Sequence, residues 1–154
     1  MFSSTTTMTC PPPDQTSAIH HMVAPLDLVA EADAYHARQM RIALQDWLRT
    51  AGVDRSLRDD IGLAVYEALA NVVEHAYTPD HPHPVMRLTA RKRHHDVFIT
   101  ITDRGRWRPP SSEASYRGRG LTVMRALTTY TDVQRTAHGT TVQLSVRHSG
   151  KGAY

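Results

Sequence analysis

The sequence predicts an α+β fold, a two-layer sandwich in which helices cover one face of a mixed, mainly antiparallel sheet. Two stretches with helical periodicity, within residues 25–52 and 57–77, precede the first pair of segments that alternate apolar and polar residues. A loop, a short helical segment and two further alternating segments follow. Helices and strands that occur in blocks, rather than in strict alternation, are typical of α+β domains.

The length and composition fit one globular domain. The chain has 154 residues, of which 40% are apolar and 21% charged, and this is enough to bury one core. No segment approaches the roughly 18 consecutive apolar residues of a membrane span, so we expect a soluble, cytoplasmic protein. We expect residues 1–18 to be a flexible extension, 19–148 to be the domain and 149–154 to be a tail.

The first strand and helix are predicted from apolar spacing and from the residues that break it. Residues 19–24 are expected to form a short edge strand. Pro25 and Asp27 then introduce a helix that ends at Gly52, a residue type common at helix C-termini. The face of this helix that recurs at helical spacing, and that we expect to be buried, comprises Met40, Leu44, Trp47 and Leu48.

A second, longer helix is predicted from Leu57 to Tyr77. It follows a pattern from Ser56 to Asp59 that resembles a capping box, in which a side-chain oxygen accepts a hydrogen bond from a free N–H of the first turn. The sequence Thr-Pro-Asp at 78–80 then breaks the helix, because proline has no backbone N–H.

The second half of the chain predicts four strands and one short helix. Strands are expected at 85–90, 97–102, 131–135 and 141–146, with a helix at 121–127 and a loop of lid-like length at 103–118. The basic run Arg91–His95 lies between the first two strands, so we expect a solvated turn rather than a surface for nucleic acid. The His81–His83 and His94–His95 pairs lack partners at zinc-ligand spacing, and no zinc site is predicted.

A polar stripe lies on the second predicted helix. At about 100° per residue, Glu67, Asn71 and His75 lie on one side, next to the apolar sector of the same helix. Polar groups in such a position need partners. The stripe is therefore either a hydrogen-bonded trio that ties the helix to a neighbouring loop or part of a binding site.

Three downstream segments add turn and glycine patterns. Asp103 ends a strand before Gly105, which suits a carboxylate that accepts a hydrogen bond from the amine of a base. A glycine pair opens a helix, where free N–H groups favour phosphate, and this segment comprises Arg117, Gly118, Arg119, Gly120 and Leu121. The last segment is Gly139-Thr140. Taken singly, the three are equally compatible with a strand turn, a solvated loop and a hairpin turn.

In combination and in this order, the four segments predict a nucleotide site and resemble the N, G1, G2 and G3 boxes of the histidine-kinase-like ATPases. The resemblance runs from about residue 22 to 147. Within that superfamily, the segment from Leu121 to Leu127 and the short lid are most similar to the stand-alone serine/threonine kinases that act as anti-sigma factors. The resemblance implies a Bergerat-type ATP-binding fold.

The resemblance also implies the ligands and the role of each residue. ATP and Mg²⁺ would be the cofactors, with Asn71 as a magnesium ligand and Asp103 as the partner of the adenine amine, supported by Thr140. Glu67 would be the catalytic base. The ATP-binding residues carried over by position are Asn71, His75, Asp103, Gly105, Arg117, Gly118, Arg119, Gly120, Leu121 and Thr140.

The resemblance further implies a partner switch, in which the kinase binds a sigma factor and phosphorylates an anti-anti-sigma protein of the STAS type, usually as a homodimer. One departure weighs against turnover, because Trp107 stands where many relatives have the second glycine of the G1 box. Two rival hypotheses therefore remain. Beside the kinase, the first rival is a regulatory module that binds ATP and partners without phosphoryl transfer. The second is an adaptor that binds no nucleotide.

Overall fold

The computed structural model describes residues 23–106 and 119–148. The predicted extension at 1–18, most of the strand predicted at 19–24, the part of the lid from residue 107 to 118 and the tail at 149–154 lie outside these ranges. Two site residues carried over from the family, Arg117 and Gly118, and also Trp107, lie outside the described residues as well.

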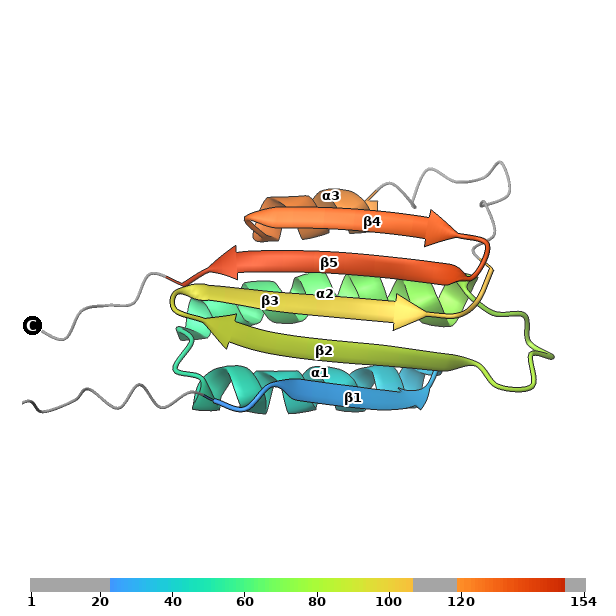
Figure 1. Cartoon of the computed structure of the whole chain (residues 1–154), viewed down its shortest axis with the longest axis horizontal. Coiled ribbons are helices and arrows are strands. Elements are labelled where there is room, and N and C mark those ends of the chain that lie inside the picture. Colours follow the sequence, from blue (N-terminus) through green and yellow to red (C-terminus); the bar gives the residue numbers. More distant parts are fainter. Residues whose placement is uncertain (1–22, 107–118, 149–154) are drawn as a thin grey trace, which may run out of the picture.

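A five-stranded sheet forms one layer of the described structure (Figure 1). Its strand order is β1-β2-β3-β5-β4, and all four pairings are antiparallel, so the described strands contain no parallel pair. The strands are β1 (Leu26–Glu31), β2 (Val85–Arg93), β3 (Asp96–Asp103), β4 (Tyr130–Thr136) and β5 (Gly139–Arg147).

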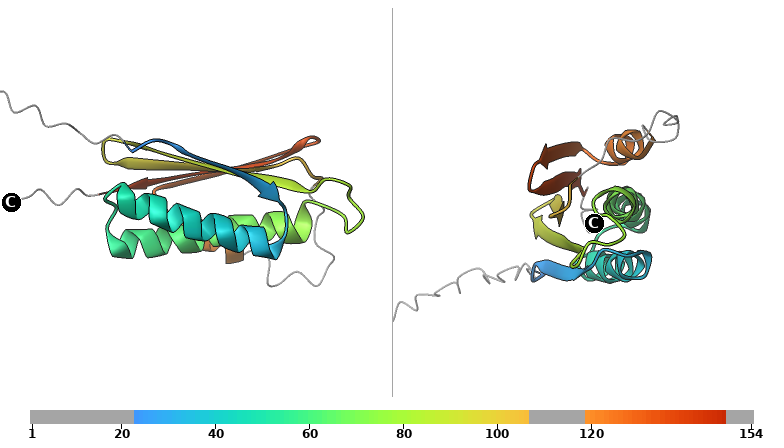
Figure 2. Two further views of the ribbon diagram at one scale, coloured as in Figure 1. Left: turned by 90° about the horizontal axis from the view of Figure 1, so that it is seen from below. Right: turned by 90° about the vertical axis from the view of Figure 1, so that its right-hand side faces the viewer.

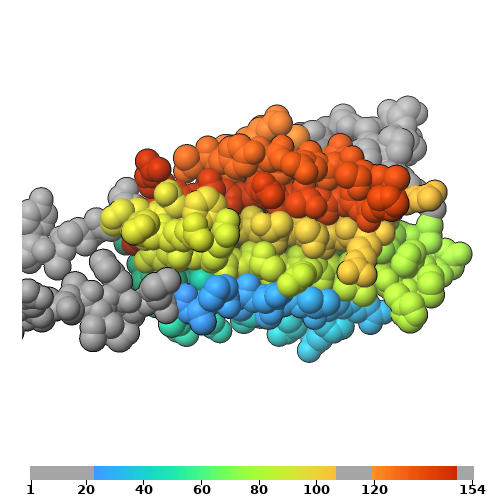
Figure 3. All heavy atoms as spheres, in the orientation of Figure 1, coloured from blue at the N-terminus to red at the C-terminus, as the bar shows by residue number. Residues whose placement is uncertain are grey.

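Three helices form the second layer, and all lie on the same face of the sheet (Figure 2). They are α1 (Ala34–Thr50), α2 (Arg55–His75) and α3 (Arg119–Leu127). α2 packs between α1 and α3. Seen from the opposite face, the strands form a continuous surface in front of the helices (Figure 3). The predicted two-layer α+β sandwich is therefore confirmed.

The core lies between the two layers and is built by the expected periodicities. Residues of β3 alternate between buried and half-buried, because successive side chains of a strand point to opposite faces. On α1 the predicted apolar face is buried as expected. The largest fully buried side chains include Leu44, Leu48, Ile61, Leu69, Met86, Leu88, Ile99, Ile101, Met124 and Leu144.

The beginning of the described structure differs from the prediction in two ways. An edge strand forms at Leu26–Glu31, within the range predicted for the first helix, and that helix starts at Ala34 rather than after Pro25. Residues 23 and 24, the described part of the strand predicted at 19–24, are not in a strand. The strand pairs with β2, from Leu26 opposite Ala90 to Glu31 opposite Val85. The segment therefore becomes an edge strand of the sheet, where its backbone groups that face β2 are paired.

Asp33 is the residue that begins α1. Its carboxylate oxygen Oδ1 accepts a hydrogen bond of 2.7 Å from the backbone N–H of His36, and its backbone is extended, as at a typical N-cap. At the second helix the predicted capping box is wrong, because α2 begins at Arg55, before Ser56. Asp54 is its N-cap and makes no side-chain cap bond.

The basic run predicted between two strands does form a hairpin turn. Arg93 pairs with Asp96 at the end of the β2–β3 ladder, and His94 adopts a left-handed backbone conformation with φ of 51°. Such a conformation is common in tight hairpin turns.

Among the described helices, none is long and apolar enough to cross a membrane.

Candidate nucleotide-binding site

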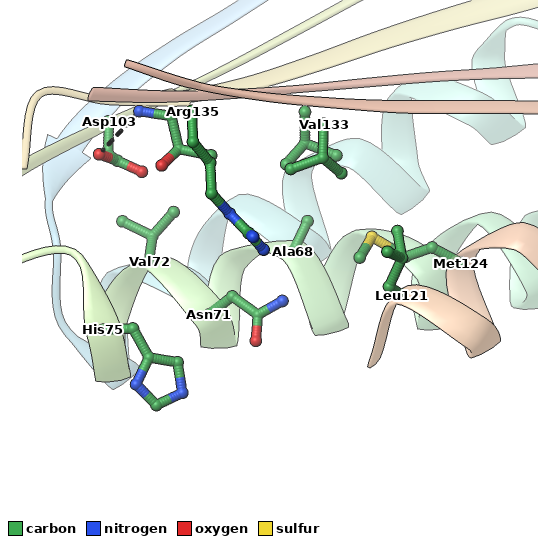
Figure 4. Close-up of a pocket in the computed structure, with 11 residues that line it drawn as sticks. Ala68, Asn71, Val72, His75, Asp103, Leu121, Met124, Val133 and Arg135 are labelled. Carbon is green, nitrogen blue, oxygen red and sulfur yellow. Dashed lines mark hydrogen bonds between the residues drawn. The ribbon is translucent and has the colours of Figure 1, made fainter. Parts of the chain in front are cut away.

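A pocket opens between the sheet and the α2–α3 helix pair (Figure 4). Strands β3, β4 and β5 form one wall, and α2 and α3 form the other. The residues that line it are Ala68, Asn71, Val72, His75, Asp103, Leu121, Met124, Val133, Arg135, Thr140 and Val142. The pocket therefore combines an apolar slot with a few polar groups at its edges, as small-molecule sites commonly do.

The polar stripe of α2 borders this pocket. Glu67, Asn71 and His75 are each partly buried, and Asn71 and His75 line the pocket itself. The Nε2 atom of His75 lies 3.4 Å from an oxygen of Glu74. The helical spacing therefore brings all three predicted residues to one side of α2, and Glu67 and Asn71 lie next to Gly120 at the start of α3.

Gly120 allows α3 to approach this stripe closely. A Cβ atom at Gly120 would lie 3.1 Å from Oε2 of Glu67 and 3.6 Å from Nδ2 of Asn71. The first turn of α3 is thus held against the two polar side chains, and the next residue, Leu121, lines the pocket. Arg119 is exposed as the first residue of α3.

Asp103 is a buried carboxylate at the end of β3, with 7% of its surface exposed. Its Oδ1 atom accepts hydrogen bonds from the backbone N–H groups of Gly105, at 2.9 Å, and Thr140, at 3.2 Å. Burial raises the pKa of Asp103, and these two donors partly oppose the rise because they stabilise the ionised form. Oδ1 is thereby held by the backbone, which leaves Oδ2 as the oxygen available to a ligand.

Two glycines make this arrangement possible through close backbone contacts. A Cβ atom at Gly105 would lie 2.0 Å from the carbonyl oxygen of Ala76, and one at Gly139 would lie 2.0 Å from that of Asp103. Gly139 also has a φ of 140°, a conformation that glycine adopts readily. The turn after β3 can therefore pack tightly against both the end of α2 and the start of β5.

Tyr77 fastens the same turn to the end of α2. Its hydroxyl accepts a hydrogen bond of 2.8 Å from the backbone N–H of Arg104 and donates one to the carbonyl oxygen of Val85. The phenol thus links the segment after α2, the start of β2 and the turn after Asp103. These bonds position the buried carboxylate relative to the helix that carries the polar stripe.

Thr140 places a buried hydroxyl at this end of the pocket. Within residues 23–106 and 119–148 no hydrogen bond of good geometry reaches this oxygen, although it lies close enough to Asp103 to help to lower the pKa of that carboxyl. Buried polar groups are nearly always paired. An exocyclic amine or a bridging water beside Oδ2 of Asp103 would satisfy it, so the residues at this end of the pocket fit a purine base.

The structure gathers most, but not all, of the predicted site around the pocket. Five of these residues line it: Asn71, His75, Asp103, Leu121 and Thr140. Glu67, Gly105 and Gly120 lie beside it, within the contacts given above. Arg117 and Gly118 lie outside the described residues.

Sequence reasoning missed the lining that β4 contributes, Val133 and Arg135. The signal was available, because residues two apart on a strand share a face. Arg135 also lies directly opposite Thr140 in the β4–β5 ladder. If the two strands are paired outward from the turn before Gly139, Arg135 comes to lie opposite Thr140, next to the predicted base site.

Comparison with known proteins places the chain among nucleotide-binding domains. Serine/threonine-protein kinase BtrW of Bordetella bronchiseptica is 35% identical in an alignment of 80 residues that covers 45% of this chain and 56% of that kinase. The chain thus spans little more than half of that relative.

Similar folds occur in solved structures. The RsbU and RsbW domains of a Mycobacterium tuberculosis protein match with a TM-score of 0.68 and 29% identity, over 81% of this chain and 32% of that one. A blue-light activated histidine kinase of Erythrobacter litoralis matches with a TM-score of 0.51 and 24% identity, over 64% and 33% of the two chains, which supports the fold alone. The sequence profile of the histidine kinase-like ATPase domain matches residues 30–146, and the chain belongs to that family.

Proposed function

We propose that this protein is an ATP-dependent serine/threonine protein kinase that acts as an anti-sigma factor. It would bind a sigma factor and phosphorylate an anti-anti-sigma antagonist of the STAS type, so that partner exchange regulates transcription. The observation that carries the proposal is the convergence of Asn71, Asp103, Leu121 and Thr140, from four separate segments, on one pocket. The similarity to a protein named as a serine/threonine kinase supports the choice of reaction.

ATP binding is proposed to use the two ends of the pocket differently. At the buried end, Oδ2 of Asp103 would accept a hydrogen bond from the adenine amine, and the hydroxyl of Thr140 would support that contact. At the other end, Asn71 would hold Mg²⁺, which when bound neutralises phosphate charge. The start of α3, at Arg119 and Gly120, would face the phosphates with the backbone N–H groups of its first turn.

The proposed chemistry assigns the proton to Glu67. The hydroxyl oxygen of a substrate serine or threonine attacks the γ-phosphorus, the bond between that phosphorus and the leaving oxygen of ADP breaks, and the hydroxyl proton passes to the Glu67 carboxylate. Glu67 is partly buried and lies beside the first turn of α3. A carboxylate there is close to the proposed phosphate end, which suits a general base. His75 would help to orient this end of the site.

The same proposal includes the setting in which the kinase works. Action on a sigma factor requires a cytoplasmic protein, and a homodimer is proposed from the resemblance to the anti-sigma kinases. Direct binding to nucleic acid or to a membrane is not part of the proposal.

A second candidate function rests on the residue at position 107. Many relatives have a glycine in the G1 box where this chain has Trp107, followed by Arg108 and two prolines. From the sequence, a bulky ring and the fixed φ of proline would restrict a segment that has to rearrange during turnover. The alternative is a regulatory module that binds ATP and protein partners without transferring phosphate.

The proposed function is tested by incubation with Mg-ATP and purified STAS-domain candidates, followed by intact mass measurement. We expect one candidate to gain the mass of one phosphate, and no gain when ATP is omitted. If ATP binds but no candidate gains mass, the regulatory module is the better account. If no nucleotide binds at all, both candidate functions fail.

A further inference from the structure

We propose that Arg135 occupies the base-binding part of the pocket when no nucleotide is present, and that it must swing out before a nucleotide can bind. Arg135 thereby acts as a built-in gate that lowers the affinity for adenine nucleotides. This inference rests on the proposed nucleotide site, and it concerns a residue to which neither the family motifs nor the proposed chemistry assigns a role.

The position of Arg135 on β4 directs its side chain into the pocket. It lies directly opposite Thr140 in the β4–β5 ladder, and the backbone N–H of Thr140 is bonded to Asp103. Figure 4 shows the side chain descending from the sheet towards α2, with the guanidinium next to Ala68 and Asn71. The side chain therefore starts beside the proposed adenine contacts and crosses the slot.

The slot that Arg135 crosses has the features of a base site. Val133 of β4 and Val142 of β5 line it from the sheet, and Ala68 and Val72 line it from α2. Two apolar walls facing each other suit a flat aromatic ring, which gains from apolar burial on both faces. The planar guanidinium and its apolar stem fill the same space in the structure.

The space that remains is too small for a base. The open volume of the pocket is about 60 Å³, which is room for a few water molecules. A cavity of roughly 150 Å³ holds benzene, and a purine is larger than benzene. A nucleotide can therefore reach Asp103 and Thr140 only if a wall moves or Arg135 leaves, and the side chain is the more mobile of the two.

Arg135 can leave without disturbing the fold. It is exposed, and β4 is an edge strand of the sheet. The walls, in contrast, include residues of the hydrophobic core such as Ala68, Val72 and Val142. A long side chain at an edge changes rotamer in nanoseconds, whereas a packed core resists deformation. Nucleotide binding would therefore select the rotamers of Arg135 that lie outside the slot.

The test compares Arg135→Ala with the wild type by calorimetric titration of Mg-ATP, ADP and adenosine. A binding-competent state that is only partly populated weakens apparent affinity by its fractional population. With Arg135 removed, we expect all three ligands to bind about three- to tenfold more tightly, because the gate acts on the base and not on the phosphates. Arg93→Ala, which removes the same charge at the far hairpin, should leave all three affinities unchanged.

Three outcomes would overturn the gate. If Arg135→Ala weakens ATP and ADP but not adenosine, the guanidinium is a phosphate ligand. If its affinities equal those of the wild type, Arg135 leaves the slot without measurable cost. If neither protein binds any of the ligands, the nucleotide site itself is wrong, and this separates failure of the proposed function from failure of the gate alone. Circular dichroism of both variants should match the wild type.

Discussion

At the scale of single residues, Asp103 is subject to two opposing effects on its pKa, burial and hydrogen bonding. The carboxylate is buried at the end of β3, so loss of solvation raises its pKa, while two backbone N–H groups stabilise the ionised form. Both donors act on Oδ1. The orientation of the side chain is therefore determined before any ligand arrives, which is the preorganisation that a specific base contact requires.

As the pH is lowered, we expect ATP affinity to start to fall at a higher pH than it would with an aspartate of ordinary pKa. An ionised Oδ2 accepts the adenine amine and a protonated one does so poorly, so binding weakens as the pH falls through the raised pKa of Asp103. Calorimetric titrations from pH 7.5 to 5 would measure this.

The control is Asp103→Asn, in which Oδ1 keeps the two backbone bonds and an NH₂ group faces the adenine amine. Loss of a hydrogen bond to a charged group costs about 1.5 to 3 kcal/mol, so this variant should bind ATP at least tenfold more weakly. In this variant the fall of ATP affinity at low pH should lose the part that comes from protonation of residue 103. The part that comes from protonation of ATP itself should be the same in both proteins. Parallel pH profiles would contradict the assignment.

Single residues were predictable from the sequence where a motif fixes the chemistry. Asn71, Asp103 and Thr140 were predicted because amide, carboxylate and hydroxyl groups recur in a recognisable order. The three line one pocket, and their roles in binding stay predictions. Arg135 was not found, because a lone arginine on a strand is ordinarily a solvated side chain. Its entry into the pocket depends on the β4–β5 register, which is a property of the assembled sheet.

At the scale of elements, the site depends on where strands and helices end and how closely their ends pack. The turn after β3 is pressed against the end of α2 at Gly105 and against the start of β5 at Gly139. Neither contact leaves room for a side chain. The glycines therefore serve packing between elements more than the flexibility of a loop.

Gly105→Ala should destabilise the protein and disturb ATP binding. The added Cβ would meet the backbone carbonyl of Ala76 at 2.0 Å, and overpacking of this kind typically costs about 1 to 3 kcal/mol. Urea unfolding and ATP titration would measure the two effects. Gly52→Ala is the comparison, because it meets no atom within 4 Å but has a φ of 72°. It should cost about 1 to 2 kcal/mol and leave ATP affinity intact; equal ATP binding in the two variants would contradict the packing account.

The existence and order of most elements were predictable, whereas the boundaries at the start of the domain were not. Strong alternation identified β2, β3 and β5, and one-sided apolar spacing identified α1 and α2. The segment 26–31 is short and follows a proline, which is also how a helix start is recognised. Its pairing with β2 decides the outcome, and the paired residues lie 54 to 64 positions apart in the chain. No local pattern contains that information.

At the scale of the whole molecule, the pocket exists only because two layers meet. The helices contribute the polar stripe and the sheet contributes Asp103, Thr140 and the β4 wall. Each layer also supplies its share of the hydrophobic core. We therefore expect that proposed binding residues at the edge of the core can be changed with little effect on the fold.

Asn71→Ala tests this separation of site and core. Asn71 is partly buried and lines the pocket, outside the buried apolar cluster. We expect Mg²⁺-dependent nucleotide binding to be lost in calorimetry while the circular dichroism spectrum is unchanged. Gln143→Ala removes an amide from the outer face of the sheet and should leave both unchanged. Global unfolding of Asn71→Ala would instead indicate that the polar stripe is structural.

The central claim is that this molecule transfers phosphate and that Glu67 is the base, and the most direct measurement is the transfer rate of Glu67→Gln under Mg-ATP. The amide keeps the size of the side chain but cannot take the proton. The account predicts unchanged ATP affinity and a fall of about two to four orders of magnitude in antagonist phosphorylation, with Asp59→Asn, an exposed acid on the same helix, at the wild-type rate. Transfer by Glu67→Gln at the wild-type rate would contradict it.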